Sequence, residues 1–245
     1  MSNMKAYCRQ CLCTLLMCAL CGASSTAFAN RFILLTEELP PYAISEGNKS
    51  SGVSVEIAAL LFERAGLDYE IKIMPWKRAY ASTLQAKNTC LFPVQRNQER
   101  EASFRWVSPL FITQVGFYTL RNSSIQIRTL EDAKPYQIGT YSGSASTQYL
   151  QNLGFDIESA EKDEQNPLKL THRRIDVWST DTLSAYYLSK QRNIHLEEQM
   201  VYLTTLRALA CNLNTPEDTL LKLDAALKSM YADGSIDTIT KHYLE

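Results

Sequence analysis

The spacing of apolar residues along positions 30–245 alternates between short continuous runs and helical periodicity. In the first third of this segment, apolar runs predict strands at 31–36, 69–74 and 90–94. Helical spacing predicts helices at 53–65 and 76–86, and a short helix after Asn97. Gly52 and Gly66 stand at the two ends of the first predicted helix. Strands that alternate with helices in this way are typical of parallel α/β sheets.

Two long extended segments, 111–120 and 201–212, interrupt this alternation. Between them a second round is predicted, with helices at 130–133, 143–150 and 181–191 and strands at 136–140 and 176–179. After them comes a helical end, over 217–230 and beyond Gly234. The economical interpretation is an α/β fold of two lobes joined by two crossing strands. Lobe 1 then comprises 30–115 and 207–245, and lobe 2 comprises 116–206; a single doubly wound domain is the alternative.

The first 29 residues predict a secretory signal peptide. Lys5 and Arg9 precede an apolar run at 11–21, and 27–29 (AFA) is a small-x-small cleavage site. The run is too short to span a membrane. A lipoprotein signal is the alternative, but Met17 and Leu20 precede the candidate cysteines where a small residue is needed. We therefore expect release into the periplasm with Asn30 as the first residue.

Charge and composition narrow the range of partners. The full chain has a net charge of −1, and loss of the signal removes only basic residues, so the remaining chain is mildly acidic. This balance argues against a nucleic-acid-binding surface. The sequence also contains no HExxH, GxSxG or P-loop motif and no His/Cys cluster with metal-ligand spacing. We expect no catalytic residues, no metal and no cofactor.

Cysteine usage points to one disulfide. Five of the seven cysteines lie in the predicted signal, which leaves Cys90 and Cys211. Two cysteines in an oxidising compartment favour a bridge, with two separately buried thiols as the alternative.

The chain resembles the bacterial extracellular solute-binding proteins of family 3, the periplasmic receptors for polar amino acids and similar solutes. The matching segments occur in the family's order: TEELPPY (36–42), GVSVEIAALLFERAG (52–66), PWKRAYASTLQAKNTC (75–90), RNQEREASFRWVSPLF (96–111), TLEDAKPYQIGTYSGSAS (129–146), RRIDVWSTDTLSAYYL (173–188) and ALKSMYADGSIDTITKHYL (226–244). This resemblance implies the type II two-lobed periplasmic binding fold, with the ligand in the cleft between the lobes. In that fold the strands carrying Cys90 and Cys211 lie side by side, which would place their Cα atoms within the ~4.4–6.8 Å that a bridge needs.

The resemblance also implies how a ligand carboxylate is held. Arg100 matches the family arginine that clamps it, and a planar guanidinium can donate two parallel hydrogen bonds to a carboxylate. Ser144, in the turn that opens the 143–150 helix, matches the second-lobe anion site at a helix N-terminus. Ala145 departs from the family pattern because it lacks a hydroxyl. A solvated arginine and an ordinary capped helix are the alternatives.

Asp181 matches the family acid that receives a ligand ammonium, although an aspartate before a helix is also a common cap. Aromatic walls are expected from Tyr42, Trp76 and Tyr141, at or after strand ends, where open α/β sheets bind ligands. Leu39 stands where amino-acid binders often place an aromatic residue. The expected ligand is an amino acid or a related small zwitterion.

The predicted function is capture of this small polar solute by a monomer that closes around it. The partner is expected to be an ABC permease or a membrane sensor. The alternative is a periplasmic enzyme of the cyclohexadienyl dehydratase type, which requires a proton donor in the same cleft. A purely structural protein is a third interpretation.

Overall fold

The computed structural model describes residues 31–47 and 49–243. The predicted signal peptide and the predicted first residue of the exported chain lie outside the described residues. No helix in the described part is long and apolar enough to cross a membrane.

Within the described residues, an eight-stranded mixed sheet has the order β4-β1-β5-β10-β6-β9-β7-β8. The strands are β1 (Phe32–Thr36), β4 (Tyr69–Ile73), β5 (Thr89–Arg96), β6 (Arg105–Leu120), β7 (Ile138–Tyr141), β8 (Ile157–Ala160), β9 (Val177–Asp181) and β10 (Leu196–Cys211). A separate hairpin joins β2 (Ile44–Glu46) to β3 (Lys49–Ser51). The sheet is parallel at both ends, where β1 pairs with β4 and β5, and β7 pairs with β8 and β9.

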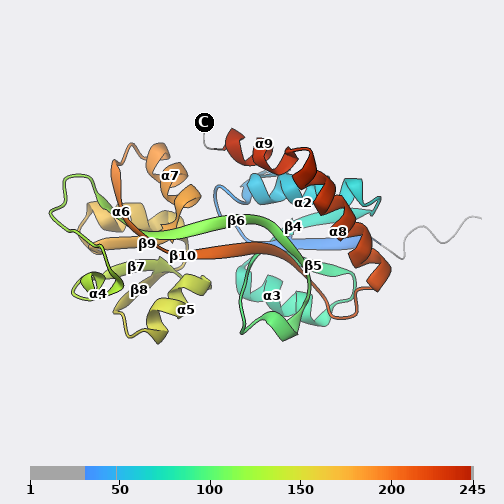
Figure 1. The fold of residues 1–245 in the computed structure, drawn as a ribbon, viewed down its shortest axis with the longest axis horizontal. Helices are drawn as coiled ribbons and strands as arrows, with labels where there is room; N and C mark the ends of the chain where they lie inside the picture. The colour runs from blue at the N-terminus through green and yellow to red at the C-terminus, as the bar shows by residue number, and fades with distance from the viewer. Residues whose placement is uncertain (1–30, 48, 244–245) are drawn as a thin grey trace, which may run out of the picture. The chain divides into compact units, whose positions relative to one another are not determined.

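The two long strands β6 and β10 connect the two parallel ends. They pair antiparallel over nearly their whole lengths, from Leu196 opposite Leu120 to Cys211 opposite Arg105. At one end β10 pairs with β5, and at the other β6 pairs with β9. Figure 1 shows both strands running through the two groups of elements. We call the elements around β5 the β5 side and those around β9 the β9 side. The predicted pair of crossing strands is confirmed.

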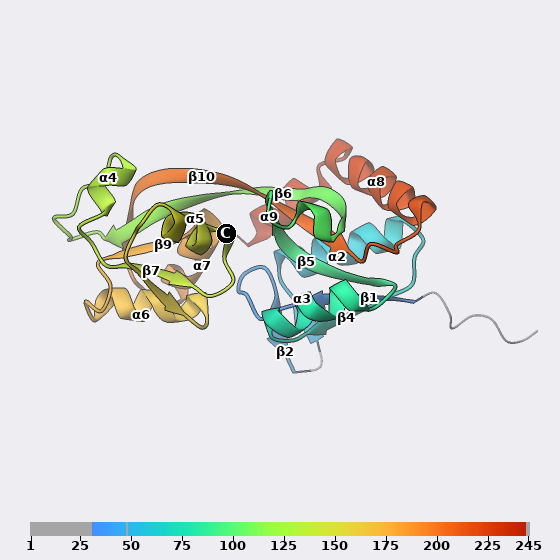
Figure 2. The ribbon, with the colours of Figure 1, turned by 90° about the horizontal axis from the view of Figure 1, so that it is seen from below.

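Helices cover both faces of the sheet on each side (Figures 1 and 2). On the β5 side, α2 (Val53–Arg64), α8 (Glu217–Ala232) and α9 (Ser235–His242) cover one face, and α3 (Trp76–Gln85) covers the other. On the β9 side, α6 (Asn166–Thr171) and α7 (Thr182–Gln191) cover one face, and α4 (Leu130–Ala133) and α5 (Ala145–Asn152) the other.

Consecutive strand residues therefore enter different cores. Leu34 packs with α2 and α8, whereas Leu35 packs in the α3 cluster. In β9, Val177 and Trp178 divide in the same way between the two clusters of the β9 side. Side chains alternate across a strand, so a strand buried on both faces is a continuous apolar run, as the sequence shows.

Gly52 fixes the start of α2. Its φ is 115°, and a Cβ built on it would lie 2.5 Å from the carbonyl oxygen of Tyr42. The amides of Val53 and Ser54 donate to the carbonyls of Pro41 and Tyr42, so the helix N-terminus is bound to the loop after β1. Only glycine fits this close approach, and it holds the loop that carries Tyr42.

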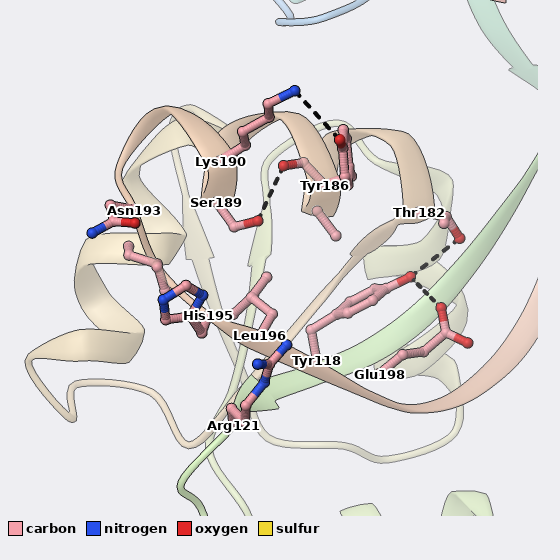
Figure 3. Close-up of a pocket in the computed structure, with 12 residues that line it drawn as sticks. Tyr118, Arg121, Thr182, Tyr186, Ser189, Lys190, Asn193, His195, Leu196 and Glu198 are labelled. Carbon is pink, nitrogen blue, oxygen red and sulfur yellow. Dashed lines mark hydrogen bonds between the residues drawn. The ribbon is translucent and has the colours of Figure 1, made fainter. Parts of the chain in front are cut away.

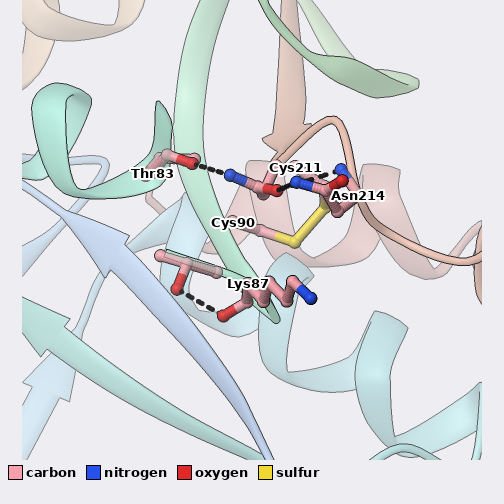
Figure 4. Close-up of a disulfide and its surroundings, with 7 residues drawn as sticks. Thr83, Lys87, Cys90, Cys211 and Asn214 are labelled. Atoms are coloured by element: carbon pink, nitrogen blue, oxygen red, sulfur yellow. Dashed lines mark hydrogen bonds between the residues drawn. A yellow bond between two sulfur atoms is a disulfide. The ribbon is translucent and has the colours of Figure 1, made fainter. Parts of the chain in front are cut away.

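A disulfide joins Cys90 in β5 to Cys211 in β10 (Figure 4). The two residues are opposite each other in the antiparallel pair, and both are fully buried. Their Cα atoms are 4.0 Å apart, slightly closer than the range expected from the sequence. The bridge attaches the end of β10 to the β5 side.

Several elements differ from the predictions. Four elements were not predicted from the sequence: the β2–β3 hairpin, β8, the one-turn helix η2 (Asp163–Gln165), and α6, which continues from η2. The helix expected after Asn97 is only a single turn, η1 (Glu101–Ser103). Both crossing strands are longer than expected, because β6 begins at Arg105 and β10 begins at Leu196.

Candidate functional site

Asp181 and Tyr42 meet in a buried contact between the two sides. Asp181 ends β9 and is the N-cap of α7, where its Oδ1 accepts from the Ser184 amide at 3.0 Å and its Oδ2 from the Ser184 hydroxyl at 2.9 Å. The Tyr42 hydroxyl donates to Oδ1 of the same carboxylate. Tyr42 is 0 % exposed and Asp181 is 4 % exposed, so this contact is closed to solvent.

Arg207, which the sequence analysis did not select, completes this group. Its Nη2 lies 3.3 Å from Asp181 Oδ2, and its guanidinium stands 5.0 Å from the centre of the Tyr42 ring. Arg207 is 2 % exposed. Burial by itself would lower the pKa of Arg207, but Tyr42, Tyr141 and Asp181 raise it overall. A buried cation is costly unless it is paired, so Asp181 is already the counter-ion of a protein side chain.

Arg100 bridges the two sides at a second point. It precedes η1, and its backbone amide donates to Asn97 Oδ1 at 3.1 Å. Its Nη1 donates to the carbonyl of Gln95 at 3.3 Å, and its Nη2 donates to the carbonyl of Gly143 at 3.2 Å. The guanidinium lies 5.3 Å from the centre of the Trp76 ring. Burial lowers the pKa of Arg100, which nevertheless stays a cation at any physiological pH.

The turn that receives Arg100 opens α5. Gly143 has a φ of 93°, and a Cβ there would lie 2.9 Å from the Trp76 ring. Ser144 is the N-cap of α5 and accepts from the Ser146 amide at 3.2 Å. The Ala145 amide donates to Gln95 Oε1 at 2.7 Å, across from the β5 side. The predicted anion site thus faces Arg100, with one of its amides donating to a glutamine.

A cavity of about 590 Å³ lies beside this turn. Trp76, Tyr141 and Gly143 line it, together with Glu37 at the end of β1. Burial raises the pKa of Glu37 to about 7, against the opposing effect of Arg207 and then Arg100. A carboxyl with a pKa near neutrality, facing a cavity, is typical of functional sites.

Asp163 lines the same cavity but has a structural role. Its Oδ1 accepts from the Trp178 indole at 2.8 Å and from Asn166 Nδ2 at 2.9 Å, and its Oδ2 accepts from the Thr180 hydroxyl at 2.5 Å. Burial raises its pKa to about 6, and these hydrogen bonds lower it in turn. Asp163 therefore fixes the buried Trp178 in the β9 side.

The structure separates the six predicted ligand residues into two groups. Trp76 and Tyr141 line the cavity, and Arg100 contacts its wall through Trp76 and Gly143. Tyr42, Asp181 and Ser144 do not line it. Sequence reasoning missed Glu37 and Arg207. The available signals were a charged residue inside the apolar segment 201–212 and an acid directly after a buried strand.

A second cavity, of about 510 Å³, lies on the β9 side between α7 and the start of β10 (Figure 3). In it the Tyr118 hydroxyl donates to Glu198 Oε2 at 2.9 Å and lies 3.1 Å from the Thr182 hydroxyl, which can donate to it. None of the predicted ligand residues lines this cavity. Within the described residues, no group of three or more His, Cys, Asp or Glu side chains is arranged to hold a metal ion.

The sequence model of the bacterial extracellular solute-binding proteins, family 3, matches residues 33–245. The chain belongs to this family. A search of curated protein sequences found no match. The family and its structural neighbours are mostly binding proteins.

Solved structures with this fold include several amino-acid-binding proteins. An ancestral arginine-binding protein bound to arginine is 21% identical with a TM-score of 0.77, over 88% of this chain and 99% of that one. A histidine kinase sensor domain with similarity to periplasmic binding proteins is 17% identical with a TM-score of 0.79, over 88% and 96%. The arginine-, lysine-, histidine-binding protein ArtJ from Geobacillus stearothermophilus is 20% identical with a TM-score of 0.74, over 87% and 94%. These likenesses establish the type II periplasmic binding fold.

Proposed function

We propose that this family 3 protein captures an amino acid or a related small zwitterion in the periplasm and delivers it as a closed complex to a membrane partner. One observation carries the proposal: the Arg100 guanidinium lies against the N-terminal turn of α5, with Nη2 3.2 Å from the Gly143 carbonyl. A guanidinium facing a helix N-terminus is a site for a carboxylate. The amino-acid-binding structural neighbours point in the same direction.

Closure follows from the origin of these groups. Arg100 comes from the β5 side and the α5 turn from the β9 side, so a carboxylate is bound fully only when the two sides meet. We place the lobe boundaries within the crossing strands, with 30–115 and 207–245 in lobe 1 and 116–206 in lobe 2. Trp76 and Tyr141 then form walls of the cleft, one from each lobe.

Asp181 is the proposed partner of the ligand ammonium, with Tyr42 beside it. In the structure its carboxylate already binds Tyr42, Ser184 and Arg207. An incoming ammonium therefore has to displace the Tyr42 hydroxyl or share the carboxylate with Arg207. In this proposal, a contact between Asp181 and the ligand ammonium replaces or shares the present contacts of Asp181 with Tyr42 and Arg207.

The membrane partner is an ABC permease or a sensor protein. The structural neighbours include an arginine-, lysine-, histidine-binding protein and a histidine kinase sensor domain, so we keep both kinds of partner in the proposal. The protein acts as a monomer in this proposal, because each half of the cleft comes from the same chain.

A thermal-shift screen over amino acids, short peptides, polyamines, organic acids and sugars tests the function. A ligand at 100 times its dissociation constant adds roughly 2.7 kcal/mol to the free energy of unfolding, which is a visible shift. We expect stabilisation by at least one amino acid or small zwitterion. Stabilisation by uncharged sugars alone would contradict the proposal.

Arg100→Ala sharpens this test. Its loss leaves the ligand carboxylate without its clamp, at a cost of about 3–5 kcal/mol, so binding falls by more than 100-fold. Arg96→Ala is the matched control: Arg96 is in the same segment, but it pairs with Glu101 and stands over Trp106. The control should bind as the wild type does; equal losses in both variants would remove Arg100 from the site.

Glu37 favours one second candidate, an enzyme of the cyclohexadienyl dehydratase type. A glutamate with a pKa of about 7 facing a cavity is a suitable proton donor for an elimination. An ancestral amino-acid-binding protein that is a precursor of cyclohexadienyl dehydratase has this fold, at 16% identity and a TM-score of 0.76. Incubation with prephenate or arogenate decides: product absorbance that disappears in Glu37→Gln supports the enzyme, and no turnover rejects it.

A further inference from the structure

Glu37 differs from the other acids around the cavity because its carboxylate is not engaged. Among the described residues, its side chain has no hydrogen bond or ion pair within bonding distance. The neighbouring Glu38 accepts from the Ser45 amide at 3.2 and 3.1 Å, and Asp163 accepts three hydrogen bonds. The Glu37 side chain is half-buried and faces the cavity, so its carboxylate is available to a positive group that enters there.

The two arginines whose charges lower the pKa of Glu37 make their direct contacts with other groups. Arg207 faces Asp181 and the Tyr42 ring, and Arg100 donates to two backbone carbonyls and lies over Trp76. They lower the pKa of Glu37 at a distance, but burial outweighs them. Neither arginine supplies the direct contact that the carboxylate lacks.

The walls of the cavity suit a cation. Trp76 and Tyr141 contribute aromatic surface, on which an amine or guanidinium is attracted by the ring electrons. The charged lining residues are more often acidic than basic: Glu37, Glu38, Glu161 and Asp163 against Lys77 and Lys162. Lys162 lies 3.6 Å from Glu164, which is outside the lining. The lining thus contains more acidic than basic side chains, as expected of a site for a positive group.

We propose that this cavity binds a cationic side chain of the solute, an amine or a guanidinium, with Glu37 as its counter-ion. The inference rests on the proposed function and narrows it to basic amino acids. The carboxylate of the ligand lies at Arg100 and the α5 turn, and its side chain extends past Trp76 to Glu37.

Proton release accompanies such binding. Free Glu37 is about half protonated near pH 7, and a bound cation favours its ionised form, so the proton is lost to solvent. The other titratable and charged groups around the cavity are Arg100, Arg207, Tyr141, Asp163, Glu38, Glu161, Lys77 and Lys162. Burial raises the pKa of Asp163 to about 6, and its three hydrogen bonds come from within the β9 side.

Arginine and its neutral isostere citrulline are the probes, with lysine, glutamine and alanine beside them. Isothermal titration of the wild type should give a dissociation constant for arginine or lysine at least about tenfold below that of its neutral counterpart. Glu37→Gln keeps the shape and removes the charge, so this preference should fall to about twofold or less. Glu197→Gln, which removes an exposed carboxylate on β10, should keep it. Titrations in two buffers of different ionisation enthalpy should show protons released by the wild type and none by Glu37→Gln.

The outcomes separate the two proposals. If neutral amino acids bind as well as basic ones, or if Glu37→Gln keeps the preference while still folded by its thermal transition, the inference is wrong and the solute-binding function stands. If Glu37→Gln fails to fold, the proton release of the wild type on arginine binding decides, and its absence overturns the inference. If no amino acid or amine binds the wild type, both proposals fall.

Discussion

At the residue scale, Asp181 shows how one carboxylate can serve the fold in several ways, beside the ligand contact proposed for it. It caps α7, accepts from Tyr42 and neutralises the buried Arg207. The sequence is compatible with a helix cap and with a ligand contact, and the structure adds a third role, that of counter-ion to Arg207. The family resemblance pointed to the ligand role, but Arg207 was visible only as an arginine within an apolar run.

Asp181→Asn should therefore destabilise the protein even without ligand. Asparagine still accepts from the Ser184 amide, so the cap survives, but the charge opposite Arg207 is lost. Leaving a buried cation unpaired costs about 3–5 kcal/mol in the free energy of unfolding, measured by urea denaturation. The matched control is Asp233→Asn, which removes a pair with Arg64 at the surface and should lower the free energy of unfolding much less.

A wild-type urea midpoint for Asp181→Asn would show that the Arg207 pair contributes nothing to stability. If ligand binding is lost as well, the negative charge of Asp181 would serve only to bind the ligand ammonium.

Glu37 makes stability depend on pH in the direction opposite to an ordinary ion-paired acid. Its pKa rises from 4.5 to about 7 on folding, so the folded protein binds more protons than the unfolded chain between these values. The contribution of Glu37 is fully present below about pH 4.5 and is lost as the pH rises to about 7, at no more than about 1.4 kcal/mol per pH unit. Denaturation of the ligand-free protein at pH 5, 6 and 7 should show this fall, and Glu37→Gln should show a smaller one.

The comparison with Glu37→Gln is needed because Asp163 titrates in a lower, overlapping window, up to about pH 6. Identical pH profiles for the wild type and Glu37→Gln would mean that the carboxyl is better solvated than its position indicates.

Some residues of the candidate site can be predicted from the sequence, and others become apparent only in the fold. The matched motifs suggested Arg100, Trp76 and Tyr141 as ligand residues, and the structure places these three at or against one cavity. Glu37 and Arg207 were missed because their importance depends on burial and on partners far away in the chain. Arg207 is paired across 26 residues, and Tyr42 reaches Asp181 across 139. No local pattern encodes such pairs.

At the element scale, the start of α2 links the fold to the site through Gly52. Gly52→Ala forces a Cβ into the Tyr42 and Pro41 carbonyl oxygens, at 2.5 and 2.8 Å, and into a backbone conformation open only to glycine. We expect a loss of at least about 2 kcal/mol in the free energy of unfolding. Because the loop must move to relieve the clash, the Tyr42 contact with Asp181 should weaken as well.

Gly66→Ala provides the comparison at the other end of the same helix. Gly66 also has a positive φ, 65°, but a Cβ there meets no atom within 4 Å. It should cost only about 1–2 kcal/mol and leave ligand affinity unchanged. Equal losses in the two variants would show that backbone strain alone, and not the approach to Tyr42, makes Gly52 necessary.

Element prediction succeeded where apolar residues form long or strictly spaced patterns. The crossing strands, α2, α7 and α8 all have such patterns, and the structure contains each of them. The failures are short elements: β8 has four residues, α6 has six, and the strands of the β2–β3 hairpin have three each. Their stability comes from pairing and packing with neighbours, so their own sequences carry little periodic signal.

At the scale of the whole molecule, two long strands and one disulfide determine how the chain crosses and returns. Cys90 and Cys211 are 121 residues apart in sequence, and the bridge closes a loop that contains β6 and every element of the β9 side. It lies at the end of β10 that pairs with β5, away from the middle of the crossing strands. The return crossing is therefore fixed to the β5 side, and the bridge lies outside the central part of both strands.

This arrangement predicts that the cysteines are paired in the native protein and that the bridge contributes chiefly to stability. A loop of this length constrains the unfolded chain by roughly 4–5 kcal/mol in the chain-entropy description. Intact-mass analysis of unreduced, denatured protein after alkylation should find neither Cys90 nor Cys211 modified. Cys90→Ala/Cys211→Ala should unfold at a clearly lower urea concentration and, while folded, bind ligand with unchanged affinity. Two alkylated cysteines without reductant would show free thiols, and a variant that folds but no longer binds would show that the bridge shapes the cleft as well.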